Sequence, residues 1–89
     1  MVRIIFTERR RRDAENVARR LQRRGARTEL SPTSDDGNDP HRGRLYTKAG
    51  FERHAARIVE EVAGVQRLTI DLASGSFDQG QNFNLWIVH

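Results

Sequence analysis

Alternation of apolar and polar side chains near the start of the chain indicates a β-strand. In residues 2–7, VRIIFT, the apolar Val2, Ile4 and Phe6 alternate with Arg3 and Thr7. This period of two places successive side chains on opposite faces of a sheet. Further apolar or alternating stretches predict four more strands, at residues 26–30, 44–48, 67–73 and 82–89.

Two segments repeat their apolar residues with the spacing of an amphipathic helix. We expect the first helix to begin near Arg12 or Asp13 and to end at Gly25, which stands where a C-terminal cap belongs. The second helix starts at about Phe51, and Gly64 is expected to close it. The apolar stripes are Ala14, Val17, Ala18 and Leu21 in the first helix and Phe51, Ala55, Ile58, Val59 and Val62 in the second.

The longest interruption of these patterns is residues 31–43, SPTSDDGNDPHRG, which contain both prolines of the chain and a dense run of turn-forming residues. This composition predicts a loop. Its acidic residues do not have the spacing of a calcium-binding loop, and no glutamate closes a twelve-residue loop there. A second turn region is expected at residues 74–81, SGSFDQGQ.

The predicted order is strand, helix, strand, strand, helix, strand, strand. Two split units of this kind place both helices on one face of the sheet. We therefore expect an α+β fold of ferredoxin-like type, a βαββαβ two-layer sandwich with an extra strand and a mostly antiparallel sheet. The 89 residues suffice for a single domain spanning residues 1–89.

Composition narrows the possible chemistry. The chain has no cysteine, which excludes disulfides, thiolate metal sites and a cysteine nucleophile. His41, His54 and His89 are scattered without acidic residues at ligand spacing, and no serine lies in a nucleophile signature. We expect a protein that is not an enzyme and that uses no metal or cofactor. No apolar run approaches the roughly 20 residues of a membrane span, and the N-terminus lacks signal-peptide order.

Positive charge is concentrated at the start of the chain. Residues 1–27 contain ten arginines and three acidic residues, a net charge of +7, against +4 for all 89 residues. Arg9, Arg10, Arg11 and Arg12 form a run that we expect in the turn between strand and helix, with few local partners. Two interpretations stay open: a solvated surface, or a contact with a polyanion such as nucleic acid.

The sheet face opposite the helices is the second candidate site. Alternation directs the core residues Val2, Ile4, Phe6, Leu68, Ile70, Leu72, Phe83, Leu85 and Ile87 toward the helices. The same alternation directs Arg3, Ile5, Arg44, Tyr46, Lys48, Asn84 and Trp86 to the other face, which we expect to be open. Aromatic rings beside cationic and amide groups suit stacking on bases or packing on sugar rings. The alternatives are that Trp86 and Tyr46 pack against their own neighbours or in a dimer.

Several segments together resemble the C-terminal domain of LytR-type cell-envelope proteins, a relative in shape of the SPOR domains. They are VRIIF, AENVARRLQRRGA, GRLYTKAGFERHAARIVEEVAGV and FNLWIV, which cover nearly the whole chain. The family's usual Asn-Gly turn after the first strand is replaced here by TERRRR. A weaker likeness to the RNA-recognition motif rests on RGRLYTKA, but Arg3 stands where that motif has a stacking aromatic residue.

The LytR and SPOR resemblance implies a non-catalytic binding module that contacts an envelope glycan or a protein partner. On this hypothesis the ligand-binding residues are Arg3, Arg44, Tyr46, Lys48 and Trp86 on the open face. The alternative is nucleic-acid binding through residues 9–12. A third hypothesis is a homodimer that pairs through the open face or through residues 44–48, taken as an edge strand.

Overall fold

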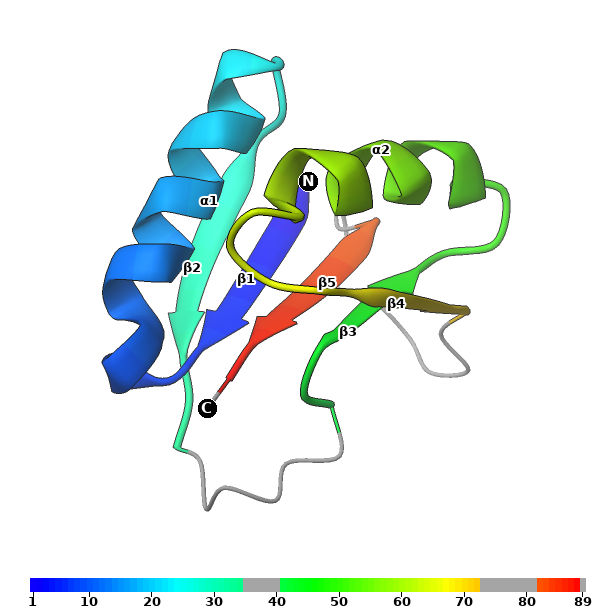
Figure 1. Cartoon of the computed structure of the whole chain (residues 1–89). Coiled ribbons are helices and arrows are strands. Elements are labelled where there is room, and N and C mark those ends of the chain that lie inside the picture. The colour runs from blue at the N-terminus through cyan, green and yellow to red at the C-terminus, as the bar shows by residue number, and fades with distance from the viewer. Residues whose placement is uncertain (35–40, 73–81, 89) are drawn as a thin grey trace.

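Five strands form one sheet in the order β2-β1-β5-β3-β4 (Figure 1). The computed structural model describes residues 1–34, 41–72 and 82–88. The predicted turn at residues 74–81, most of the acidic stretch of the first loop, and His89 lie outside these residues. The elements are β1 (Val2–Phe6), a 3₁₀ turn (Glu8–Arg10), α1 (Arg11–Arg23), β2 (Thr28–Pro32), β3 (Arg44–Thr47), α2 (Glu52–Val62), β4 (Thr69–Leu72) and β5 (Phe83–Ile87).

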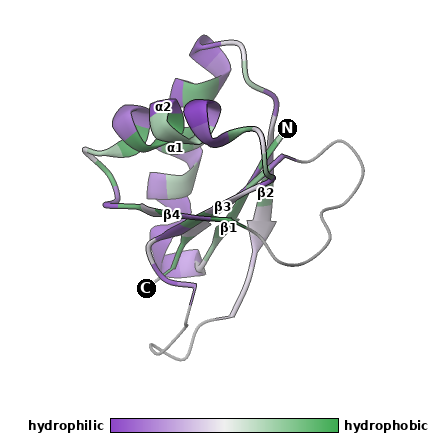
Figure 2. Cartoon of the chain, turned by 90° about the vertical axis from the view of Figure 1, so that its right-hand side faces the viewer, coloured by the Kyte–Doolittle hydropathy of each residue, from purple (hydrophilic) through white to green (hydrophobic). Residues whose placement is uncertain are grey.

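Both helices cover the same face of the sheet, as Figure 2 shows edge-on. The predicted α+β architecture of two layers, of ferredoxin-like type, is thereby confirmed. The strand directions differ from the mostly antiparallel sheet that we expected. β1 is parallel to both β2 and β5, β3 is parallel to β4, and the antiparallel ladder joins β3 to β5. Each helix returns the chain beside the strand that it left, which makes the two flanking pairs parallel.

The core lies between the helices and the inner face of the sheet. The stripe predicted for α1 is confirmed, since all four of its residues are buried. In α2, Ala55, Ile58 and Val62 are buried, and they pack with the inward side chains of β1, β3 and β5. One predicted core residue is wrong: Leu72, at the end of β4, is 60% exposed. It belongs to β4, which is an edge strand of the sheet among the described residues.

The ends of the helices depart slightly from the prediction. α1 begins at Arg11, within one residue of the expected start near Arg12 or Asp13. Gly25 has a φ of 89°, the left-handed conformation that a glycine cap adopts. Gly64 does not take a positive φ, and α2 ends at Val62 without a glycine of that kind. Among the described helices, none is long and apolar enough to span a membrane.

The position of β3 corrects one expectation about self-association. We expected residues 44–48 to form an edge strand, but β3 lies between β5 and β4 and is hydrogen-bonded to both. The edges of the sheet are β2 and β4. A strand that is paired on both sides has no free backbone groups with which to pair a second copy.

Candidate functional site

The register of the central strands brings the predicted residues of the outer face together. Arg3 on β1 aligns with Asn84 on β5, and Asn84 in turn aligns with Tyr46 on β3. Ile5 aligns with Trp86 one step further along. Three strands from distant parts of the chain thus supply one surface, on the side of the sheet away from the helices.

An aromatic cluster of Trp86, Tyr46 and His41 occupies this surface. The rings of His41 and Trp86 are stacked, with centroids 4.4 Å apart and an interplanar angle of 26°. His41 Nδ1 and the Tyr46 hydroxyl are joined by a hydrogen bond of 2.7 Å, and the two rings meet edge to face. His41 is held just before β3, where its carbonyl accepts a hydrogen bond from the Arg44 amide. All three side chains belong to half-buried residues, so part of the cluster is accessible.

Sequence reasoning did not identify His41 as part of this site. The three histidines are scattered along the chain, and His41 is distant in sequence from Trp86. The local signal that was available is its position five residues before Tyr46, at the entrance to a predicted strand. That spacing does not reveal the stacking on Trp86, which depends on the pairing of β3 with β5.

The cations around the cluster make surface ion pairs. Arg44 donates a hydrogen bond of 2.9 Å to the Asp71 carboxylate on β4, and Arg3 lies 3.8 Å from the Glu29 carboxylate on β2. Lys48 follows β3 and is half-buried. Exposed ion pairs of this kind contribute at most about 1 kcal/mol, so a ligand anion can compete for these side chains at low cost.

The outer face is less open than we expected. Towards the carboxyl ends of β1 and β5, Ile5, Thr7 and Val88 are 8%, 5% and 0% exposed. The accessible part is therefore the region of Arg3, Tyr46 and Trp86. At its centre the Asn84 side-chain oxygen is buried and has no hydrogen-bond partner among the described residues, which leaves an acceptor unsatisfied.

Within the arginine run, Arg10 is a structural residue. Its half-buried guanidinium donates to the Asp13 carboxylate at 2.7 Å, to the Gln66 side-chain oxygen at 2.9 Å and to the Val65 carbonyl at 3.4 Å. These bonds connect the start of α1 to the segment that follows α2. The expectation that the run has few local partners is wrong for this residue.

Arg11 is also engaged within the molecule. It donates two hydrogen bonds to the Glu8 carboxylate, at 2.6 and 2.8 Å, and its guanidinium carbon lies 5.0 Å from the centre of the Phe6 ring. The hydrogen bonds with Arg11 lower the pKa of Glu8 and raise that of Arg11. Arg9, Arg11 and Arg12 are all exposed residues. Of the four predicted polyanion-binding arginines, Arg10 is thus half-buried and the other three are exposed.

The described residues do not contain a cluster of three or more histidine or acidic side chains arranged to hold a metal ion. Comparison with protein-family models, curated proteins and solved structures finds no significant match to this chain. The resemblance to the LytR C-terminal and SPOR domains therefore stays a prediction from the sequence.

Proposed function

We propose that this chain is a non-catalytic binding module whose ligand lies on the outer sheet face, against Trp86 and Tyr46. The observation that carries the proposal is the half-buried cluster of His41, Tyr46 and Trp86 on three interacting segments. Aromatic rings held rigidly at a surface lose little entropy on binding, and they offer an apolar face beside polar edges. Arg3, Arg44 and Lys48 surround the rings and supply charge at the rim.

An envelope glycan is the ligand class that this surface and the sequence resemblance support together. Sugar rings present an apolar face that packs on Trp and Tyr, and their hydroxyls donate hydrogen bonds. The unsatisfied Asn84 oxygen between Arg3 and Tyr46 is an acceptor for such a hydroxyl once the neighbouring side chains move aside. Arg44 and Lys48 are suited to the carboxylates of a glycan-linked peptide. A protein partner that inserts an aromatic ring is the other ligand of this proposal.

The sole tryptophan of the chain makes a direct test available, because fluorescence reports on Trp86 alone. We expect soluble peptidoglycan glycan fragments to change the intensity or the wavelength of Trp86 emission in a saturable way. Replacing Tyr46 with Ala removes one ring of the cluster and is expected to weaken binding by roughly two- to tenfold. Arg19→Ala, on the opposite, helical side of the molecule, is the matched control and leaves the titration unchanged. Binding that leaves Trp86 emission unaltered would place the ligand elsewhere.

Nucleic-acid binding is a second candidate, favoured by how the arginines gather at one end of the molecule. The side chain of Arg10 reaches Gln66, which precedes the exposed Arg67 and lies beside Gly43. The exposed Arg42 precedes that glycine. Arg42 and Arg67 therefore lie near the arginine run although they are far from it in sequence. Such a basic end attracts phosphates irrespective of base sequence.

Salt dependence separates the two candidates. Binding to single-stranded RNA through phosphates falls with salt at a log–log slope of about −0.7 per neutralised phosphate. Packing of sugar rings on Trp86 responds far less. The appropriate variant is Arg9→Ala with Arg12→Ala, because both residues are exposed and the hydrogen bonds of Arg10 and Arg11 are kept. Loss of salt-sensitive RNA binding in this variant, with intact glycan binding, would assign the two ligands to separate surfaces.

A homodimer is the remaining candidate, and the exposed Leu72 indicates β4 as its interface. This residue is 60% exposed on the edge strand β4. Light scattering across a range of protein concentrations measures the mass directly. A dimer that Leu72→Lys converts to a monomer would support pairing through β4, whereas a monomer at all concentrations would exclude it.

A further inference from the structure

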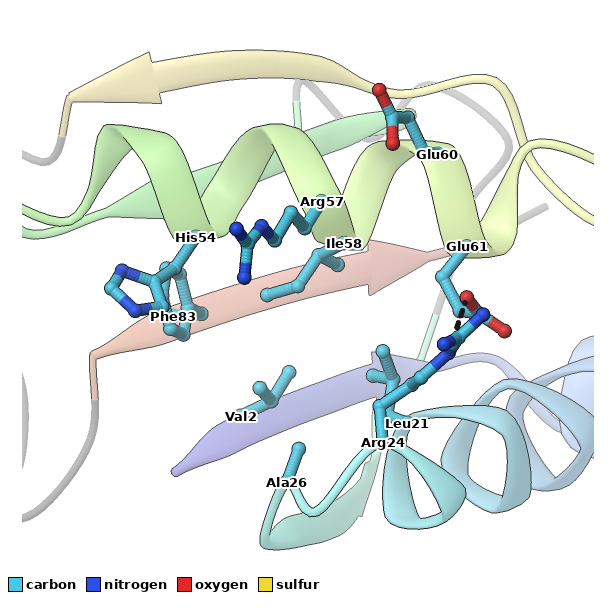
Figure 3. A pocket seen from close by; sticks show the side chains of 10 residues that line it. All are labelled: Val2, Leu21, Arg24, Ala26, His54, Arg57, Ile58, Glu60, Glu61 and Phe83. Carbon is cyan, nitrogen blue, oxygen red and sulfur yellow. Dashed lines mark hydrogen bonds and ion pairs between the residues drawn. The ribbon is translucent and has the colours of Figure 1, made fainter.

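A groove lies between the two helices, on the opposite side of the sheet from the aromatic cluster. It has a volume of about 490 Å³, within the range of about 300 to 1,000 Å³ that is usual for small-molecule sites. Figure 3 shows its floor, formed by Val2 on β1 and Phe83 on β5, with Ile58 of α2 and Leu21 of α1 on its two walls. Ala26, just after α1, completes the apolar lining.

The groove results from the way the two helices diverge. Near the end of α2 the helices are in contact, where Arg20 of α1 donates to the Glu61 carbonyl and Arg24 pairs with the Glu61 carboxylate at 3.2 Å. From there α2 runs across the sheet, away from α1 (Figure 1). The space between them is widest beside the start of β5, and the Arg24–Glu61 pair closes the narrow end (Figure 3).

The charged side chains around the groove differ in whether they form an ion pair. Arg24 is paired with Glu61, and Glu60, which also belongs to the lining, lies on the side of α2 away from Val2 and Phe83 (Figure 3). Arg57 projects from α2 over the apolar lining, beside His54, and it makes no hydrogen bond or ion pair with any described residue. The groove thus combines an apolar floor with a guanidinium, that of Arg57, which is not engaged in an ion pair among the described residues.

From this combination we infer that the groove between α1 and α2 binds a fatty-acid-type ligand, a hydrocarbon chain with one carboxylate. The chain packs on Val2, Phe83 and Ile58 where it is removed from water. The carboxylate lies at the mouth and pairs with Arg57, whose planar guanidinium is suited to a carboxylate. The inference is independent of the proposed sheet-face ligand, because the two sites lie on opposite sides of the sheet.

Octanoate is a suitable probe, and backbone amide NMR shifts of the full chain report where it binds. We expect saturable shifts at Ala26, Ile58 and Phe83, and weaker binding of octylammonium, which has the same chain with the opposite charge. Arg57→Gln is expected to weaken octanoate binding by roughly two- to fivefold, the effect of one partly exposed ion pair. Arg53→Gln, an exposed arginine on the same helix outside the groove, is the matched control and leaves the affinity unchanged.

A second variant tests the groove itself without changing its charge. Ala26→Phe fills the groove from its lining and is expected to abolish the octanoate shifts, while the remaining amide signals confirm that the fold persists. Octylammonium that binds as tightly as octanoate would overturn the role of Arg57. Shifts that are absent from the groove residues, or that survive Ala26→Phe, would overturn the site itself.

Discussion

At the scale of single residues, His41 connects the two aromatic side chains of the outer sheet face. It stacks on Trp86 and shares a hydrogen bond with the Tyr46 hydroxyl. In doing so it covers one face of the Trp86 ring, the same kind of contact that a ligand ring makes. His41 therefore contributes to stability, and a ligand of the kind proposed above would have to compete with it for the Trp86 ring.

Replacing His41 with Ala tests this double role. We expect Trp86 emission to move to longer wavelength, because the indole becomes more exposed to water. The loss of one ring contact and one hydrogen bond is expected to lower the free energy of unfolding by about 1 to 2 kcal/mol. The measurement is urea unfolding followed by Trp86 fluorescence. His54→Ala, at an exposed position of α2, serves as control, and an unchanged Trp86 spectrum in His41→Ala would contradict the stacked arrangement.

A second prediction at the residue scale concerns Glu8 and the dependence of stability on pH. Its carboxylate accepts two hydrogen bonds from Arg11, which lowers the pKa of Glu8 below its ordinary value of 4.5. Because the pKa of Glu8 is lower in the folded than in the unfolded state, its ionised carboxylate stabilises the fold at pH values above the unfolded-state pKa. This stabilisation is lost as the pH falls through the lower pKa that Glu8 has in the folded state. The contribution is small, since both side chains are exposed.

Carbon NMR of the Glu8 carboxyl group measures this pKa directly. Arg11→Gln is expected to return the pKa of Glu8 towards its ordinary value, whereas Arg12→Gln should leave it unchanged, because Arg12 makes no contact with Glu8 in the structure. Equal effects of the two substitutions would indicate general screening of the basic surface rather than a specific pair.

At the scale of elements, the arginine run is explained in part by the packing of α1. Cations at the start of a helix oppose its dipole, by about 0.3 to 1 kcal/mol each, so a run of four arginines there is unfavourable in isolation. Asp13 in the first turn and Glu8 in the preceding turn offset this cost through their pairs with Arg10 and Arg11. Arg10 also joins α1 to the segment between α2 and β4.

Arg10→Ala should therefore destabilise the fold, whereas Arg12→Ala should not. Removing Arg10 leaves the Gln66 side chain and the Val65 carbonyl without this donor, and we expect the free energy of unfolding to fall by about 1 to 2 kcal/mol. Arg12 is exposed, and its replacement is expected to stay within about 0.5 kcal/mol. Urea unfolding of the two variants measures the difference. Equal stabilities would show that the Arg10 bonds contribute nothing net.

At the scale of the whole molecule, the last strand joins two similar halves. The segments β1-α1-β2 and β3-α2-β4 each form a parallel pair with its helix on the same face. β5 enters between them, parallel to β1 and antiparallel to β3. The outer face, with Arg3, Tyr46 and Trp86, comes from both halves and from β5. A complete site therefore requires the complete sheet.

Local patterns were sufficient to predict much of this arrangement. The apolar stripe of α1 and the cap at Gly25 follow from side-chain periodicity and from the conformational freedom of glycine, which act within a few residues. The assignment of Arg3, Tyr46 and Trp86 to one face follows from the period of two along each strand, whatever the neighbouring strand is. The sequence therefore determined the elements, the number of layers and the composition of each sheet face.

Only the tertiary structure decided which elements are neighbours. Strand order and direction, the interior place of β3, and the exposure of Leu72 at an edge depend on pairings between distant segments. The stacking of His41 on Trp86, the bond from Arg10 to Gln66 and the groove under Arg57 arise in the same way. Periodicity specifies which way a side chain faces within its own element. Which other side chain it contacts depends on how the hydrophobic surfaces of all the elements are buried together. No local pattern contains that information.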